Sequence, residues 1–169
     1  MSHNLYASSL PVFIRALKNL AAILNKGAAY AKDKGMDESV VTAWRLYPNM
    51  FPLSRQVQIA CDVVKGAGAR LAGIDIPSFP DTEVTFVELQ ARIDKTVAFL
   101  GKISEAQLEG AAERKIKLKA GSQEFEFTGA EYLTTWVLPN LYFHVTTAYN
   151  LLRGIGVELG KGDFLGSGQ

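Results

Sequence analysis

Asn140 and His144 are the residues of this chain whose types and spacing are best suited to chemistry. They stand four residues apart in the stretch from Leu133 to Arg153, so on a helix they would share one face. A polar pair centred on an apolar stripe must find hydrogen-bond partners or serve a function. The apolar residues predicted for that face are Leu133, Val137, Leu141, Ala148, Leu151 and Leu152.

Composition limits the metal chemistry that His144 can support. Zinc and related ions take three or four ligands and prefer neutral imidazole or thiolate. The chain has two histidines, His3 and His144, and one cysteine, Cys61, so neither a three-histidine site nor a cysteine-based zinc site can form within it. Amide oxygens beside one histidine would be a poor first-row metal site. We therefore expect no metal cofactor, with His144 as the weak candidate ligand if a divalent ion binds.

Simpler interpretations of these residues stay open. Asn140 and His144 could hydrogen-bond each other and fix the register of packed helices, since a lone histidine on an apolar face is more often a satisfied core residue. Cys61 follows Ala60 inside a predicted helix and is interpreted as a core residue. No Gly-x-Ser-x-Gly motif is present. The catalytic residues, if there are any, are unknown from the sequence.

The glycine-rich segment 154–169 superficially resembles a phosphate-binding loop. Such a loop needs glycine five residues before the Gly160-Lys161 pair and Ser or Thr after the lysine, but the chain has Ile155 and Gly162 there. We interpret the segment as the end of the last helix followed by a partly extended tail.

The length of 169 residues predicts one domain, 1–169. Eighteen basic and seventeen acidic residues leave a net charge of +1, which argues against a nucleic-acid-binding protein. No apolar run approaches the ~18 residues of a membrane span, and the start of the chain lacks the pattern of a signal peptide. We expect a cytoplasmic protein that binds neither membrane nor nucleic acid.

Hydrophobic periodicity predicts four long helices. The first runs from about residue 11 to 31, with a serine cap at Ser8 or Ser9; the second covers 53–72, and the third begins at Asp81 or Thr82 and reaches residue 100. The last opens with a Thr128-to-Glu131 capping box and reaches residue 153, with a kink or break near Pro139. Shorter helical segments are expected after Asp37 and at 104–107. Gly66 and Gly68 in the second long helix suggest close approach by another helix.

Residues 114–127 change from helical periodicity to strict alternation, which predicts a β-hairpin. Lysines of the first strand would face glutamates of the second. One hairpin alone is marginal in water, so it should pack on the helices. The predicted fold is therefore mainly all-α: a four-helix bundle with a small β-hairpin inserted before the last helix.

Three phrases of the sequence resemble an uncharacterised microbial domain-of-unknown-function family, over residues 6 to 165. They are Met50-Phe-Pro-Leu-Ser-Arg-Gln-Val-Gln-Ile-Ala60, then Phe127-Thr-Gly129 with Tyr132-Leu133, and Pro139-Asn140 with Phe143-His-Val-Thr-Thr-Ala-Tyr149. That family belongs to the DinB/YfiT-like superfamily of four-helix bundles, which are often dimeric and are described as metalloenzymes.

The resemblance implies a site between the second and last long helices. In better-understood relatives, one histidine of the second helix and two of the last, four apart, hold a divalent metal, and some relatives use low-molecular-weight thiols such as mycothiol or bacillithiol. By the resemblance, His144 falls on one ligand position, Asn140 on another, and Gln56 is the nearest polar residue for the third. Two of the three ligands are therefore replaced.

The expected site is a pocket lined by Gln56, Asn140, Tyr142 and His144. The leading hypothesis is a homodimeric small-molecule-binding or stress-related accessory protein with a degenerate metal site. The alternative is a metal- or thiol-dependent transferase or hydrolase that uses His144.

Overall fold

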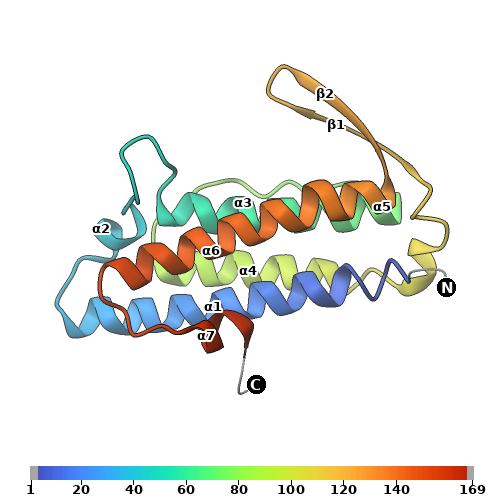
Figure 1. Ribbon diagram of the computed structural model, residues 1–169. Helices are drawn as coiled ribbons and strands as arrows, with labels where there is room; N and C mark the ends of the chain where they lie inside the picture. Colours follow the sequence, from blue (N-terminus) through green and yellow to red (C-terminus); the bar gives the residue numbers. More distant parts are fainter. Residues whose placement is uncertain (1–3, 167–169) are drawn as a thin grey trace.

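Four long helical segments lie side by side in a computed structural model that describes residues 4–166 (Figure 1). They are α1 (Leu10–Asp33), α3 (Leu53–Ala72), α4 (Phe86–Leu100) and a last segment that ends in α6 (Leu138–Gly154). α3 packs extensively on both α6 and α4, and α1 packs on α4. The core is made of fully buried apolar side chains, among them Phe13, Leu17, Leu24, Leu53, Val57, Leu71, Leu89, Ile93, Leu133 and Leu141. The predicted four-helix architecture is confirmed.

Short elements lie between the long helices and after the last of them. They are α2 (Glu38–Thr42), the 3-10 helix η1 (Glu105–Leu108) and α7 (Lys161–Leu165). Asp37 caps α2 as predicted, accepting a hydrogen bond from the Ser39 amide at 2.8 Å. None of the helices between residues 4 and 166 is long and apolar enough to cross a membrane.

The start of α1 agrees with the prediction, but its cap does not. Ser9 occupies the cap position and its hydroxyl makes no capping bond to the helix. Instead it donates to the Leu5 carbonyl at 2.6 Å. The turn formed by residues 5–9 uses the hydroxyl that an exposed cap would have offered to the free amides.

α4 begins at Phe86, and its predicted start at Asp81 or Thr82 was wrong. Thr85 is the cap: its hydroxyl accepts from the Glu88 amide, and the Glu88 carboxylate accepts from the amides of Val84 and Thr85. These hydrogen bonds to the charged carboxylate lower the pKa of Glu88. Residues 74–85 stay extended, because the acidic side chains of this connector bind cations of α3 and α4.

The two glycines of α3 play different roles. A Cβ on Gly68 would lie 2.7 Å from Leu100 Cδ2, so this glycine admits the end of α4 as expected. A Cβ on Gly66 would lie 2.6 Å from Nη1 of Arg70, which belongs to α3 itself. The expectation of close helix approach was wrong at Gly66.

The hairpin consists of β1 (Lys115–Ala120) and β2 (Gln123–Thr128), paired antiparallel with Lys117 opposite Glu126. Lys117 Nζ lies 3.3 Å from a Glu126 carboxylate oxygen, as the predicted ionic face requires. The rings of Phe125 and Phe127 pack on Trp136, with centroids 4.9 Å and 6.0 Å away. The hairpin base therefore rests on the last helical segment, while its tip projects from the bundle (Figure 1).

The last helical segment is built from α5 (Gly129–Glu131), a π-helical stretch, η2 (Tyr132–Val137), and α6. The Thr128 capping box opens it as predicted. The Leu138 amide bonds the Leu133 carbonyl five residues back. The wider π-helical turns precede Pro139, which has no N–H to bond the Thr135 carbonyl. Where the sequence predicted a kink or break near Pro139, the structure has a π-helical segment that continues directly into α6.

The tail after α6 is less extended than predicted. α7 forms within it and packs on α1, where Lys26 Nζ lies 2.7 Å from an Asp163 carboxylate oxygen. The side-chain amide of Asn19 also donates to the Phe164 carbonyl at 3.0 Å. The prediction of an extended tail over 154–169 was wrong at α7, and residues 167–169 lie outside the described part.

Candidate functional site

Gln56 of α3 and His144 of α6 face each other across the contact between these two helices. Gln56 Oε1 lies 2.7 Å from His144 Nδ1. Gln56 is 1% exposed and His144 is 8% exposed. The predicted site between the second and last long helices therefore brings together two of its four residues, joined by one buried hydrogen bond.

The orientation of Gln56 fixes the proton on the imidazole. Gln56 Nε2 donates to the Phe51 carbonyl at 3.0 Å, so Oε1 must face His144. An amide oxygen only accepts, and Nδ1 of a neutral imidazole must therefore carry the hydrogen. In this tautomer Nε2 is unprotonated and carries a free lone pair.

The surroundings of His144 keep the imidazole neutral. Burial lowers the pKa of His144 below its ordinary value of 6.5, and the positive charge of Arg55 lowers it further. Nε2 makes no hydrogen bond within residues 4–166, and it is not among the solvent-shielded polar atoms that lack a partner there. It therefore contacts solvent. The exposed ring of Phe143 lies edge-on to the imidazole, with centroids 5.2 Å apart.

Asn140 lies one turn before His144 but bonds elsewhere. Its side-chain amide donates to the Trp136 carbonyl at 2.6 Å, within the same helical segment. Asn140 and His144 therefore do not hydrogen-bond each other, and the register interpretation fails in that form. Gln56 takes the role that the sequence suggested for Asn140.

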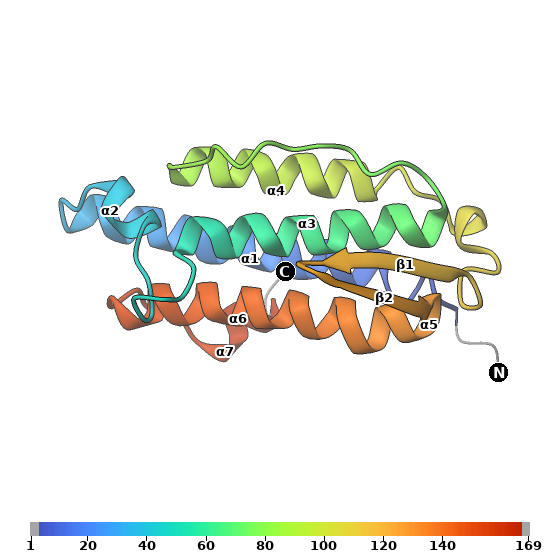
Figure 2. The same cartoon turned by 90° about the horizontal axis from the view of Figure 1, so that it is seen from above.

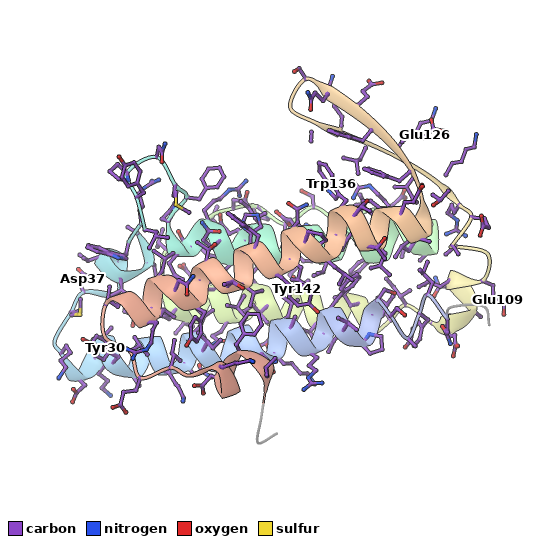
Figure 3. The ribbon with its side chains drawn as sticks, viewed as in Figure 1. Tyr30, Asp37, Glu109, Glu126, Trp136 and Tyr142 are labelled. Atoms are coloured by element: carbon purple, nitrogen blue, oxygen red, sulfur yellow. The ribbon has the colours of Figure 1, made fainter. Side chains whose placement is uncertain are left out.

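Tyr142 lies on another side of α6. It is 41% exposed and lines a hollow of about 290 Å³ with residues of α1 and α7, among them Asn19 and Phe164. Figure 3 shows its side chain between α6 and α1. Neither Gln56 nor His144 lines this hollow, or those at the hairpin, under the tail and beside Phe79. The hollow beside Tyr142 is therefore distinct from the Gln56–His144 contact.

The residues at the site do not fit a divalent metal. The donors that the structure joins there are one imidazole and one amide oxygen, Gln56 Oε1, which is already bonded to His144. Within residues 4–166, no group of three or more His, Cys, Asp or Glu side chains could hold a metal ion. His3 lies outside the described residues. The chemistry available is that of a neutral base and hydrogen-bond acceptor at Nε2.

Cys61 is a core residue, as interpreted from the sequence. Burial raises the pKa of its thiol to about 12, although Thr96 and Arg92 oppose the shift. The thiolate is the reactive form of cysteine, so this thiol is protonated and unreactive at neutral pH.

A buried charge cluster between α3 and α4 was missed from the sequence. The Arg92 side chain is 1% exposed and pairs with Asp62, Asp81 and Glu83 at 2.8–3.0 Å. Its Nε is the single buried side-chain nitrogen or oxygen without a partner among the described residues. One signal was present: Arg92 falls within the apolar stripe of Leu89 and Ile93, where a charge needs buried partners.

The comparisons with known proteins agree with this fold. The model of the domain of unknown function DUF1993 matches residues 5–165. The crystal structure of a DinB family member protein from Shewanella denitrificans is similar, with 43% sequence identity and a TM-score of 0.90, over 96% of this chain and 92% of that one. No curated protein matches the chain significantly. With a family model that spans nearly the whole chain and a close structural relative, this chain belongs to the DUF1993 family of DinB-like proteins.

Proposed function

We propose that this protein binds a small molecule at the surface end of the Gln56–His144 contact and that its inherited metal site is degenerate. The observation that supports the proposal is the hydrogen bond of 2.7 Å between Gln56 and His144. This bond uses two side chains at the inferred ligand positions and leaves Nε2 free. In this proposal the protein acts as a small-molecule-binding or stress-related accessory protein.

The ligand class follows from the chemistry of Nε2. A lone pair that touches solvent accepts a hydrogen bond, and the exposed Phe143 ring beside it favours an apolar or aromatic body. A neutral phenol or thiol fits both requirements. The loss of metal removes Lewis-acid activation from the proposal, so binding is expected without turnover.

Nitrogen NMR of the imidazole tests the binding proposal directly. Titration with a panel of phenols and thiols should shift the His144 Nε2 resonance and leave Nδ1 protonated. His144→Gln should abolish binding, while Tyr142→Phe, which changes another side of α6, should not. Unchanged affinity in His144→Gln would place the ligand elsewhere.

Metal analysis tests the degenerate site. The purified protein should retain zinc or nickel at far below one equivalent, with the same residual amount in His144→Ala. Stoichiometric metal that disappears in His144→Ala would overturn this part of the proposal.

The runner-up is an enzyme, a transferase or hydrolase in which His144 acts as the general base. The fixed tautomer supports it, because a base needs an unprotonated nitrogen held in one orientation. The rate of p-nitrophenyl acetate hydrolysis would then fall strongly in His144→Gln. In the native protein the rate would decline as pH falls, with a pKa below 6.5. Equal rates in the two proteins would reject this alternative.

We also propose that the protein is a cytoplasmic homodimer. The loop between α2 and α3 exposes Trp44, Leu46, Tyr47 and Phe51, and exposed apolar side chains that cluster in this way are typical of interaction sites. Light scattering should give twice the chain mass, and Leu46→Glu should shift it toward the monomer. A monomeric native protein at all concentrations would contradict the dimer.

A further inference from the structure

The connector between α3 and α4, residues 74–85, is held mainly by charged side chains. Arg92 binds the carboxylates of Asp81 and Glu83 and also donates to the Pro80 carbonyl at 3.0 Å. Arg55 pairs with Asp81, and the Gln58 amide donates to Glu83 at 3.0 Å. The connector runs back along the helix pair in Figure 2. Its acidic residues thus occupy a cationic surface of the bundle.

Phe79 adds an aromatic contact to this surface. The Lys65 and Lys95 ammonium groups lie 4.2 Å and 4.1 Å from the centroid of its ring. Lys65 comes from α3 and Lys95 from α4. One ring that attracts two cations ties the connector to both helices. Hollows of about 280 Å³ and 250 Å³ border this ring.

Other forces hold the connector weakly. Its apolar residues Ile74, Ile76 and Val84 are exposed. Within the described chain, residues 75–83 make no backbone-to-backbone hydrogen bond. Asp81 and Asp62 are more than one-third exposed, so water competes for their charges. Segments with few buried apolar contacts and exposed polar contacts open at low free energy.

We propose that the surface beneath the connector is a binding groove for an acidic, aromatic peptide segment, which the connector fills in the resting protein. The groove carries the cations Arg55, Lys65, Arg92 and Lys95 and two acidic side chains of the helices: Asp62, which pairs with Lys65 and Arg92, and Glu88, which lines the hollow beside Lys95. The connector supplies an aromatic ring followed by two carboxylates. A partner segment of the same chemistry would displace it.

The unpaired Nε of Arg92 is consistent with an exchangeable occupant. Three carboxylates and one carbonyl contact the two terminal nitrogens of Arg92, while Nε has no acceptor. The connector therefore satisfies the buried guanidinium incompletely. A partner that places one more acceptor beside Nε would gain a charge-assisted hydrogen bond that the connector does not make.

The test is a competition between the connector and a peptide copy of it. A fluorescein-labelled peptide with the sequence of residues 76–85 is titrated with the full chain and followed by anisotropy. Asp81→Asn combined with Glu83→Gln weakens the connector in place and should bind the peptide at least about tenfold more tightly than the native protein. Asp75→Asn changes an exposed acid of the same connector that makes no ion pair in the described structure, and it should bind like the native protein.

Two further controls examine the groove itself. Lys95→Ala, added to the double variant, should weaken binding because it removes one of the two cations at the aromatic ring. A peptide with both acids neutralised should bind poorly to every variant, and raising NaCl to about 0.5 M should weaken the binding of the acidic peptide.

The proposal is overturned if the folded double variant binds the peptide no more tightly than Asp75→Asn, or if Lys95→Ala has no effect. Circular dichroism establishes folding. If the double variant does not fold, Phe79→Ala replaces it, because this change leaves the ion pairs intact and vacates the place between the lysines. Equal peptide affinity in Phe79→Ala and Asp75→Asn would then reject the groove.

Discussion

The Gln56–His144 pair and the Arg92 cluster are two solutions to one problem, a polar group in the interior of a helical bundle. The neutral imidazole is satisfied by one amide oxygen, and that amide is held by one backbone carbonyl. The guanidinium contacts three carboxylates and a carbonyl and still has an unpaired Nε.

The difference shows how charge shapes the chain around it. A neutral pair needs only one further partner, a backbone carbonyl, so α3 and α6 pack closely against each other. A buried cation needs acidic partners, and two of them come from a connector that must stay extended to reach it. The late start of α4 at Phe86 is thus a consequence of Arg92.

The largest effect is expected when the charge cluster loses its centre. Arg92→Leu should lower the free energy of unfolding by about 3–5 kcal/mol, because three carboxylates lose their shared cation. Urea denaturation measures the change, and Asp94→Asn, at an exposed residue of the same helix, serves as the control. A loss below about 1 kcal/mol would mean that the cluster is solvated like surface ion pairs.

Replacing one residue of the Gln56–His144 pair should lower the free energy of unfolding less than Arg92→Leu does. The loss should depend on whether the other residue of the pair is still present. Gln56→Leu should cost about 1–3 kcal/mol, because the His144 Nδ1–H and the Phe51 carbonyl lose their partner. In a double-mutant cycle with His144→Leu, the combined loss should be smaller than the sum of the single losses. Additive losses would show that the two residues do not depend on each other.

The pH dependence of stability offers a smaller contrast between the regions. The pKa of His144 is lowered in the folded protein, so the unfolded chain takes up its proton first as pH falls. Stability should therefore decline as pH falls below about 6.5 and level off once the folded histidine is protonated. His144→Leu should remove this decline in denaturation curves between pH 7.5 and the onset of carboxylate titration. A decline that persists in the variant would assign it to other groups.

The exposed hairpin should show the smallest effect. Lys117 and Glu126 are both well exposed, so Lys117→Ala should change the free energy of unfolding by less than about 0.5 kcal/mol. Thermal and urea denaturation both measure it. A change comparable to that of Arg92→Leu would remove the distinction between buried and surface charge.

The fold could be predicted from the sequence because its signals are local. Periodic apolar residues, the Thr128 capping box and the alternation of the hairpin each lie within a few neighbouring residues. The start of α4 was misplaced because Asp81 and Thr82 also form a plausible helix start. The choice between that start and Thr85 depends on Arg92 and Arg55, whose contacts with the connector are tertiary.

The site could be predicted only in part, because the contacts that decide it are also tertiary. His144 and Gln56 were named as pocket residues, and the structure joins them. Asn140 shares the predicted face, but its amide finds a carbonyl one turn back, a contact that spacing alone does not distinguish from a bond to His144. Tyr142 differs from His144 by two positions, which on a helix is more than half a turn.

The Phe51 carbonyl has a consequence for how this site can vary. The atom that fixes the imidazole proton belongs to the main chain, and the Phe51 side chain is 54% exposed. The loop is closed by a hydrogen bond of 3.0 Å from the Leu53 amide to the Trp44 carbonyl. Sequence drift at position 51 therefore leaves the tautomer of His144 untouched, whereas inserting or deleting one residue between Trp44 and Leu53 would change it without altering any side chain of the site.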